Sequence, residues 1–227
     1  MTAMSIGPKQ ALLAEFATLA RALGSPQRLE ILEHLAQGER GVEALARRVR
    51  LSIANASQHL QQLKRAGLVA SRRDGKFILY RLTDERVVVL MRALFDVGER
   101  NRAEVGRILR SYFTERDNLE PVTRGALLER TRAGLVTVID VRPADEYAAG
   151  HLPGAVNIPL AELEARLAEL DPDQEIVAYC RGPYCVFSFE AVALLRARGF
   201  NIRRLEDGLP EWRAAGLPLE RSDMLSH

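Results

Sequence analysis

Two cysteines, Cys180 and Cys185, are the residues of this sequence best suited to covalent chemistry, and they lie five positions apart in the segment CRGPYC. Two cysteines make no disulfide framework and cannot complete a zinc site alone. The histidines show no metal-ligand spacing, so we expect neither a metal nor a cofactor; they are His34, His59, His151 and His227. In a reducing compartment such a close pair indicates reactive rather than structural thiols.

Cys180 follows a strand-like run, EIVAY, and precedes a helical run, VFSFEAVALLRARG. Ligands gather at the carboxyl ends of strands in a parallel α/β sheet. Gly182 and Pro183 permit a tight curve that turns backbone N–H groups inward, and with Arg181 these donors favour a thiolate and can hold a persulfide anion. The predicted persulfide-binding loop comprises Arg181, Gly182, Pro183, Tyr184, Cys185 and Val186.

Cys185 has two interpretations at this point. It is either a small side chain buried at the start of the helix, or a resolving thiol that attacks a persulfide on Cys180 and forms a disulfide or polysulfide bridge. Such a bridge requires Cα atoms within about 7 Å of each other, which a curled six-residue loop can provide.

The elements around this loop alternate between strands and helices beyond residue 122. We expect strands at residues 136–140, 155–157, 176–179 and 202–204, and helices at residues 160–170, 186–198 and 210–215. This alternation predicts an α/β domain with a mainly parallel sheet covered by helices.

Three segments of this half resemble the rhodanese family: VIDVRPADEYAAGHLPGAVNIP, YCRGPYC and EDGLPEWRAAGLP. The resemblance implies that Cys180 takes sulfur from a sulfane sulfur donor as a persulfide and passes it to a thiol acceptor. It further implies that Asp140, Arg142 and Glu146 brace the loop, and that His151 and Trp212 are mainly structural. Phosphatases and arsenate reductases of related fold use Cys-x5-Arg, but the sixth residue after Cys180 is Val186, which argues against a phosphate or arsenate substrate.

The first half of the chain is basic. Residues 1–100 hold 16 Lys and Arg against 10 Asp and Glu, a net charge of +6, whereas residues 101–227 hold 16 against 20, a net charge of −4. Within residues 44–82, nine basic side chains stand against one acid. This clustering is typical of a domain that binds a polyanion.

The elements of the first half follow a recognisable order. Helices are expected at residues 9–23, 26–38, 41–49 and 53–66, followed by a hairpin of residues 68–73 and 76–82 joined by Asp74-Gly75. The fourth helix places Ile53, Ala56, Leu60 and Leu63 on one side and an amide-rich face on the other. This is the order of a mainly α winged helix-turn-helix domain, whose second helix enters the major groove of DNA. Residues 84–113 are predicted to form one long amphipathic helix suited to a dimer interface.

Three consecutive segments resemble the ArsR/SmtB family of repressors: ALGSPQRLEILEHL, LSIANASQHLQQLKRAGLV and SRRDGKFILYRL. The resemblance implies a homodimer on a double-stranded, pseudo-palindromic operator. The predicted DNA contacts are Ser52, Asn55, Ser57, Gln58 and His59 on the helix, and Arg72, Arg73 and Lys76 on the wing; His59 has an equal claim to a packing or capping role, and Ser52 to a cap alone. The third helix has no cysteine and the last has no histidine, so metal sensing in this half is not expected.

Together these patterns predict two domains, residues 1–113 and 122–219, with a linker at 114–121 and a tail at 220–227. No apolar run approaches the roughly 18 residues of a membrane helix, and no signal peptide is apparent, so we expect a cytoplasmic protein without a membrane partner. Three hypotheses remain open: a repressor responsive to sulfane sulfur or redox state, a sulfurtransferase tethered to DNA, and a repressor with an inert dimerisation module.

Overall fold

The computed structural model describes residues 7–114, 117 and 120–222, which form two compact units, Met1–Val87 and Val88–His227. Residues 1–6, linker residues 115, 116, 118 and 119, and tail residues 223–227 lie outside the described part. The division between the units falls inside a helix, α5, that the sequence analysis places wholly in the first domain. The domain boundaries drawn from the sequence therefore stay a prediction.

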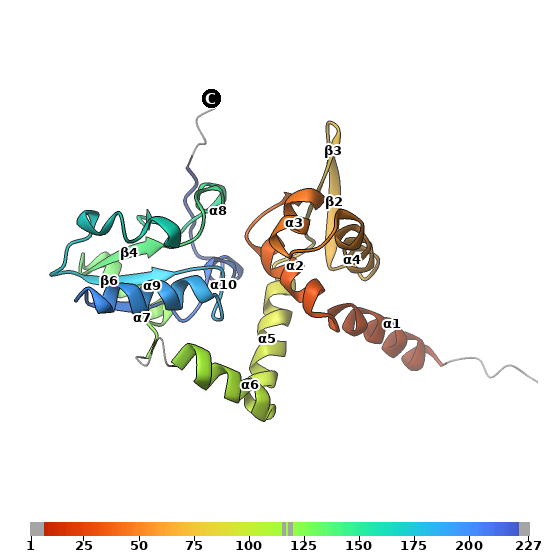
Figure 1. Ribbon diagram of the computed structural model, residues 1–227. Coiled ribbons are helices and arrows are strands. Elements are labelled where there is room, and N and C mark those ends of the chain that lie inside the picture. The colour runs from red at the N-terminus through yellow and green to blue at the C-terminus, as the bar shows by residue number, and fades with distance from the viewer. Residues whose placement is uncertain (1–6, 115–116, 118–119, 223–227) are drawn as a thin grey trace, which may run out of the picture. The chain divides into compact units, whose positions relative to one another are not determined.

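The first unit contains four helices, labelled in Figure 1: α1 (Pro8–Leu23), α2 (Pro26–Ala36), α3 (Val42–Arg48) and α4 (Ile53–Arg65). Ser25 and Pro26 start α2 as expected, although the Ser25 hydroxyl donates to the side chain of Gln27 instead of capping the helix. Between α3 and α4 the chain reverses through Arg50, whose φ of 52° is unusual for a residue with a side chain.

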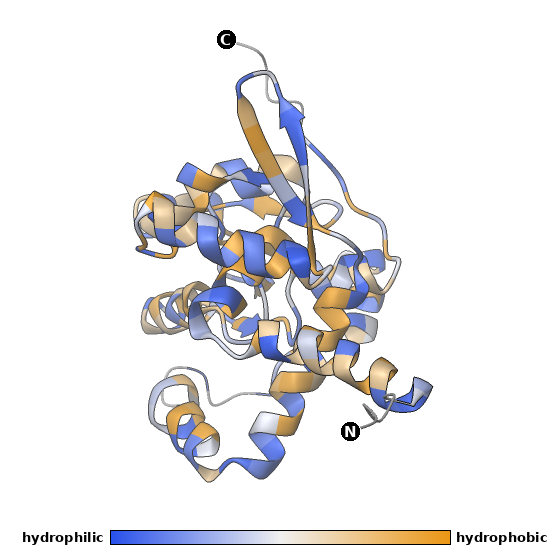
Figure 2. Ribbon diagram, turned by 90° about the vertical axis from the view of Figure 1, so that its right-hand side faces the viewer, coloured by the Kyte–Doolittle hydropathy of each residue, from blue (hydrophilic) through white to orange (hydrophobic). Residues whose placement is uncertain are grey.

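The wing of the first unit is an antiparallel hairpin of β2 (Val69–Asp74) and β3 (Phe77–Leu82), with the short β1 (Arg40–Gly41) on the other side of β3. Asp74 pairs with Phe77, so the two-residue turn is Gly75-Lys76, one position later than predicted. The reason is that Gly75, with φ of 58°, occupies the first turn position, where glycine is favoured. The hydropathy colouring in Figure 2 contrasts the hydrophilic β2 with the more hydrophobic β3.

The prediction of one continuous helix over residues 84–113 is wrong about its continuity. The structure divides it into α5 (Arg86–Asn101), α6 (Ala103–Ile108) and a π-helical turn (Leu109–Thr114). Arg102 between α5 and α6 has extended backbone angles. The side chain of Asn101 donates to the carbonyl of Val97 at 2.9 Å, and this competition for a helical acceptor accounts for the end of α5.

The second unit is built on a four-stranded sheet in the order β5-β4-β6-β7, with every neighbouring pair parallel. Its strands are β4 (Val136–Asp140), β5 (Val156–Asn157), β6 (Glu175–Tyr179) and β7 (Ile202–Arg204). All four predicted strands are confirmed, two of them to the residue. The parallel arrangement follows from the helical connections between the strands.

The helices of the second unit are α7 (Arg124–Arg132), α8 (Ala144–Ala149), α9 (Val186–Ala197) and α10 (Leu209–Ala214). The sequence analysis predicted α9 and α10 but not α7 or α8. It was wrong about residues 160–170, which form two short 3-10 turns, Leu160–Glu162 and Leu167–Glu169. The four leucines of this segment have helical spacing, but two tight turns also direct Leu163 and Leu170 into the core.

Strand β6 sends successive side chains to two different hydrophobic cores. Ile176, Ala178 and Cys180 belong to the core shared with α9, whereas Val177 and Tyr179 belong to the core shared with α7 and α10. Because both faces of the strand are buried over residues 176–179, this part of its sequence lacks the polar and apolar alternation of a half-exposed strand. This alternation of side chains places Cys180 on the side of α9.

Candidate functional site

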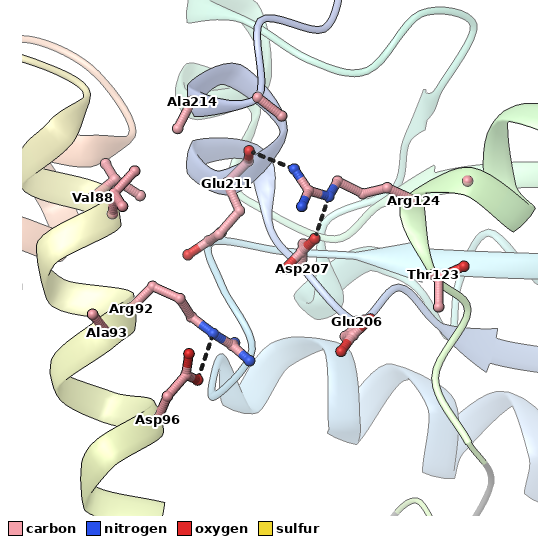
Figure 3. Close-up of a pocket in the computed structure, with 13 residues that line it drawn as sticks. Val88, Arg92, Ala93, Asp96, Thr123, Arg124, Glu206, Asp207, Glu211 and Ala214 are labelled. Carbon is pink, nitrogen blue, oxygen red and sulfur yellow. Dashed lines mark hydrogen bonds and ion pairs between the residues drawn. The ribbon is translucent and has the colours of Figure 1, made fainter.

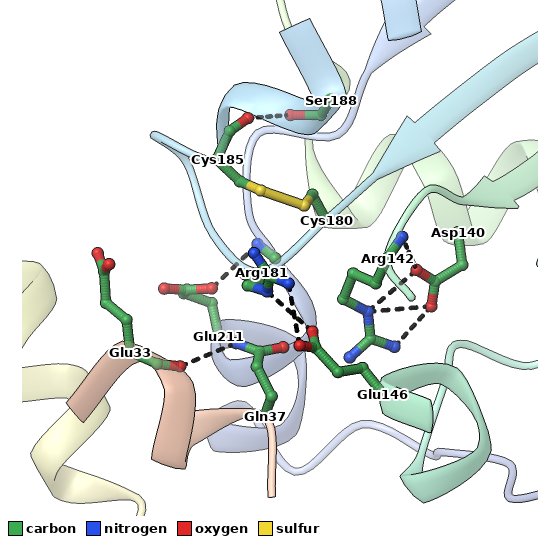
Figure 4. The surroundings of a disulfide bond; sticks show 11 residues. Glu33, Gln37, Asp140, Arg142, Glu146, Cys180, Arg181, Cys185, Ser188 and Glu211 are labelled. Carbon is green, nitrogen blue, oxygen red and sulfur yellow. Dashed lines mark hydrogen bonds and ion pairs between the residues drawn. A yellow bond between two sulfur atoms is a disulfide. The ribbon is translucent and has the colours of Figure 1, made fainter. Parts of the chain in front are cut away.

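Cys180 lies immediately after β6 and is buried, with 1% of its surface exposed. Its sulfur is joined by a disulfide to Cys185, and the two Cα atoms are 6.1 Å apart. Figure 4 shows the bond spanning the loop that connects β6 to α9. Cys185 is half-buried and occupies the N-cap position of α9. The loop is thus curled tightly enough for the two sulfurs to react with each other.

Two backbone hydrogen bonds hold the loop of residues 180–185, one within the loop itself and one from Leu209. The amide of Cys185 donates to the carbonyl of Gly182 at 3.1 Å, and the amide of Leu209 donates to the carbonyl of Cys180 at 3.1 Å. A Cβ added to Gly208 would lie 2.3 Å from the amide nitrogen of Gly182, so the chain at this point admits only glycine. Gly208 lies in the segment EDGLPEW, but no local pattern there predicts this close approach to the loop.

Arg181, which the sequence predicts to favour the thiolate and to help hold a persulfide anion, is paired with a carboxylate in the structure. Its guanidinium donates two hydrogen bonds to the carboxylate of Glu146, Nε to Oε2 at 2.9 Å and Nη2 to Oε1 at 3.0 Å, and lies over the ring of Phe187. Glu146 is fully buried. This ion pair joins the loop to α8.

Beneath the loop, Asp140 and Arg142 form a buried ion pair with both side chains fully inaccessible to solvent. The Asp140 carboxylate accepts from Arg142 Nη2 at 2.5 Å and from Arg142 Nε at 3.0 Å, and Arg142 also donates to the carbonyl of Gly150 at 2.8 Å. Burial opposes the charged guanidinium, but the hydrogen bonds and negative charge of Asp140 prevail and raise the pKa of Arg142.

Tyr179 completes this network, a role that the sequence did not reveal. Its hydroxyl donates to Asp140 Oδ2 at 2.5 Å and accepts from the amide of Leu152 at 3.1 Å. Burial, followed by the negative charge of Asp140, raises the pKa of Tyr179 well above its usual value. The phenol therefore stays protonated and serves as a donor. The only available signal was a tyrosine at the end of a buried strand, where its hydroxyl must find a partner.

His151 and Trp212 are both buried in the second unit, and their polar atoms bond to backbone carbonyls. Nδ1 of His151 lies 3.0 Å from the carbonyl oxygen of Tyr147, and the two rings are stacked. Backbone bonds join His151 to Glu220. The indole N–H of Trp212 donates to the carbonyl of Pro218 at 2.9 Å. These contacts attach the last described residues to the domain.

Glu211 lines a pocket of about 730 Å³ in the second unit that the sequence analysis did not foresee (Figure 3). Two ion pairs lie along it, Arg92 with Asp96 at 2.9 Å and Arg124 with Asp207 at 2.7 Å. Glu211 accepts a hydrogen bond from the amide of Gly208 at 3.0 Å. Burial raises the pKa of Glu211.

The predicted DNA-contacting helix is α4. Ser52 caps it, since its hydroxyl accepts from the amide of Asn55 at 3.2 Å. Asn55 and Gln58 are exposed, whereas Ser57 and His59 are half-buried. Burial, followed by the positive charge of Arg28, lowers the pKa of His59.

One residue of α4 departs from the expected pattern. Ile53 was assigned to the buried side, but 54% of its surface is exposed, while Ala56, Leu60 and Leu63 are buried. The reason is its position in the first helical turn, beyond the elements that cover the rest of the apolar side. The exposed amide-rich face of α4 is otherwise as predicted.

The three basic residues of the wing differ in their surroundings. Arg72 is committed to Glu39 by a hydrogen bond of 2.8 Å and also lies 3.5 Å from Asp74. Arg73 donates to the carbonyl of Gly75, and the ammonium of Lys76 lies over the ring of Phe77. All three are exposed, so they can reach a phosphate.

Among the described residues, 7–114, 117 and 120–222, no three His, Cys, Asp or Glu side chains come together in a way that could hold a metal ion. No helix among them has the length and apolar character needed to cross a membrane.

Two family models match the chain: that of the rhodanese-like domain over residues 123–215, and that of a helix-turn-helix domain over residues 23–72. The chain is 46% identical over 219 residues to the HTH-type transcriptional regulator Rv0324 of Mycobacterium tuberculosis, covering 96% of both chains. Over 85 residues it is 32% identical to a sulfurtransferase of Allochromatium vinosum, covering 37% of this chain and 78% of that protein.

A solved structure is also similar to this chain. It is the homodimeric winged helix-turn-helix DNA-binding domain, fragment 1–100, of a possible ArsR-family regulator from Mycobacterium bovis. The two are 40% identical, the match covers 44% of this chain and 94% of that one, and the TM-score is 0.40.

Proposed function

The chain belongs to the family of HTH-type transcriptional regulators that join an ArsR/SmtB-type winged helix-turn-helix to a rhodanese-like domain, and we propose that it is a repressor whose affinity for its operator depends on sulfur chemistry at Cys180. The observation that carries this proposal is the Cys180–Cys185 disulfide in the loop between β6 and α9. The bridge gives a DNA-binding regulator two covalent states, the reduced dithiol and the disulfide.

Operator binding is assigned to the exposed face of α4 and to the wing. Asn55 and Gln58 offer amide groups that donate to and accept from base edges, while Arg73 and Lys76 offer charge to phosphates. The fully buried Leu60 and Leu63 fix α4 on its unit, so the exposed face is presented on a rigid element.

A homodimer is supported by apolar side chains that each unit leaves exposed. On α1, Leu12, Leu13 and Phe16 are 54–58% exposed. On α5, Leu94 and Val97 are exposed, three residues apart and therefore on one face. Exposed helical stripes of this kind are typical of protein interfaces. A dimer would present two copies of α4 to a pseudo-palindromic operator.

The sulfur chemistry follows from the pairing of the two thiols. The Cys180 thiolate attacks the outer sulfur of a persulfide or polysulfide donor, forming Cys180–S–SH and releasing the rest of the donor as a thiolate. The Cys185 thiolate then attacks the inner sulfur, on Cys180, and expels hydrosulfide. The product is the disulfide of the structure, in which the donor's sulfane sulfur has been reduced and the two thiols oxidised.

We assign the weaker DNA affinity to the disulfide form. The test is an operator titration of wild type and Cys180→Ser, with and without inorganic polysulfide, at fixed salt because the affinity depends on salt. Polysulfide should weaken wild-type binding by about tenfold or more, within the usual range of allosteric coupling, and leave the variant unchanged. Equal release of the two proteins would overturn the proposal.

The Cys185→Ser variant shows whether operator release is caused by the persulfide on Cys180 or by the Cys180–Cys185 disulfide. If the disulfide is the signal, this variant forms the persulfide but keeps its affinity for the operator. If polysulfide still releases the Cys185→Ser variant, the persulfide itself is the signal and the resolving role of Cys185 is wrong.

A tethered sulfurtransferase is the second candidate, and the similarity to the Allochromatium sulfurtransferase favours it. An enzyme must turn over, whereas a switch needs one modification per chain. Thiocyanate formation from thiosulfate and cyanide, measured over many equivalents, distinguishes the two. Reciprocity supplies a further test: if the sulfur state changes DNA affinity, operator DNA must change the sulfur equilibrium at Cys180 equally.

A further inference from the structure

The two cysteines of the bridge differ in their exposure to solvent. Cys180 is 1% exposed and is packed in the core that β6 shares with α9, among residues such as Ala178 and Ala191. Cys185 is half-buried, outside the fully buried set of that core, at the N-cap of α9. A reagent from solution therefore meets Cys185 first.

The electrostatic environment of Cys185 also favours an incoming thiolate. Cys185 stands at the amino end of a twelve-residue helix, where the first amide groups and the helix dipole attract anions. The nearby charge of Arg181 does not contribute, because its guanidinium is paired with Glu146. In the oxidised protein, attack on Cys180 would instead require the anion to reach a cysteine that is almost fully buried in the core that β6 shares with α9.

We propose that Cys185 is the thiol-exchange site of the oxidised protein, and that small cellular thiols open the bridge by forming a mixed disulfide at this residue. This inference rests on the proposed function and deepens it. In that function, the exchange reaction at Cys185 returns the oxidised regulator to its reduced state. This role differs from that of a resolving thiol. A resolving thiol has only to reach Cys180, whereas a thiol-exchange site must also be reached by thiols from solution.

The reaction balances as two successive exchanges. A thiolate, R–S⁻, attacks the sulfur of Cys185; the new R–S–S bond forms as the bond to Cys180 breaks, and the electron pair leaves on Cys180, which takes a proton from water. A second R–S⁻ attacks the R sulfur of the mixed disulfide, giving R–S–S–R and the Cys185 thiolate. Two thiols thus supply the two electrons that reduce the bridge.

The experiment uses the oxidised wild-type chain. It is mixed with 2-mercaptoethanesulfonate, quenched rapidly with excess iodoacetamide, and mapped by peptide mass spectrometry. The expected partly reduced species carries the mercaptoethanesulfonate adduct on Cys185 and the alkyl group on Cys180. The opposite pattern, an adduct on Cys180 and an alkylated Cys185, would overturn the proposal. The experiment contains no DNA, so its outcome is independent of whether polysulfide releases the operator.

Discussion

Gly208 and Gly182 meet backbone to backbone, so that a Cβ at position 208 would lie 2.3 Å from the Gly182 amide nitrogen. We therefore expect Gly208→Ala to displace the loop of the two cysteines and to destabilise the second unit by about 1–3 kcal/mol. Urea unfolding followed by the fluorescence of Trp212, the single tryptophan of the chain, measures the loss.

Gly125→Ala is the matched control for this prediction. Gly125 lies in α7, and no atom lies within 4 Å of the position that a Cβ would take there, so alanine should be neutral or should stabilise the helix by up to about 1 kcal/mol. Equal stability of the Gly208→Ala and Gly125→Ala chains would show that the loop yields to a side chain at position 208.

Asp140→Asn tests the buried ion pair. The substitution keeps the shape of the side chain but leaves the fully buried guanidinium of Arg142 without its counter-charge, and we expect a loss of about 3–5 kcal/mol. Asp173→Asn, at an exposed site, removes the same charge and should change stability by less than about 0.5 kcal/mol. Thermal unfolding of both variants provides the comparison; a loss below about 1 kcal/mol for Asp140→Asn would contradict the role of the pair.

Arg50→Gly should stabilise the first unit. Arg50 follows α3 with a positive φ, and the amides of Arg50 and Leu51 donate to the carbonyls of Arg47 and Ala46, the bonding of a helix end that favours glycine. Glycine removes the left-handed strain, which is worth about 1 kcal/mol. Hydrogen exchange of the α3 and α4 amides measures the gain.

The control for Arg50→Gly is Arg47→Gly. It removes the same charge from the same exposed surface, but at a helical position, where glycine costs up to about 1 kcal/mol. The two variants should therefore change the stability of the unit in opposite directions. Changes of the same sign would mean that the strain at position 50 is not the controlling factor.

Glu211 makes the second unit less stable as the pH rises. Burial raises its folded pKa, so this group contributes most to stability below the unfolded carboxyl pKa and loses its contribution as the pH rises through the folded value. Glu211→Gln, which can still accept from the Gly208 amide, should gain stability relative to wild type as the pH rises above the unfolded carboxyl pKa of about 4.3.

Glu169→Gln has the opposite sign and serves as the comparison. The hydrogen bond from Arg166 lowers the pKa of Glu169, so its contribution is present above the unfolded carboxyl pKa and is lost as the pH falls through the folded value. Relative to wild type, this variant should lose stability as the pH rises. Urea titrations across the pH range that give parallel curves for all three proteins would refute both assignments.

Gln58→Ala and Arg73→Ala separate base contacts from phosphate contacts on the DNA-binding unit. The first should weaken specific binding by about 1–3 kcal/mol and leave the salt dependence unchanged. The second should weaken specific and non-specific binding alike and reduce the salt slope by about one. Titrations at several salt concentrations on operator and random DNA decide between them, and a reduced salt slope for Gln58→Ala would place that residue on a phosphate instead.

The sequence predicted the regular elements well where local signals and burial agree. Strand β6 was found because its residues 176–179 are apolar, and α4 because Ser52 caps an amphipathic run. The break at Arg102 was missed because apolar spacing continues through it, and the segment of Leu163 and Leu170 was misassigned because two 3-10 turns satisfy the same spacing.

The sequence named residues of the candidate site but did not reveal how they pair. Spacing alone placed Cys180 and Cys185 within bridging distance. It did not show that Glu146, 35 residues earlier, neutralises Arg181, or that Tyr179 bonds Asp140 across 39 positions. Such pairings depend on the order of strands in the sheet, which no local pattern contains.

The neighbouring positions of Tyr179, the last residue of β6, and Cys180, the residue after it, have a practical consequence for genetics. The two side chains are adjacent in sequence but lie in different hydrophobic cores, and only Tyr179 bonds to the buried Asp140. A small replacement such as Cys180→Ala should therefore remove the thiol and leave a folded protein near its normal abundance, whereas replacement of Tyr179 should deplete the protein. A phenotype at position 180 will thus report lost chemistry, and a phenotype at position 179 lost protein.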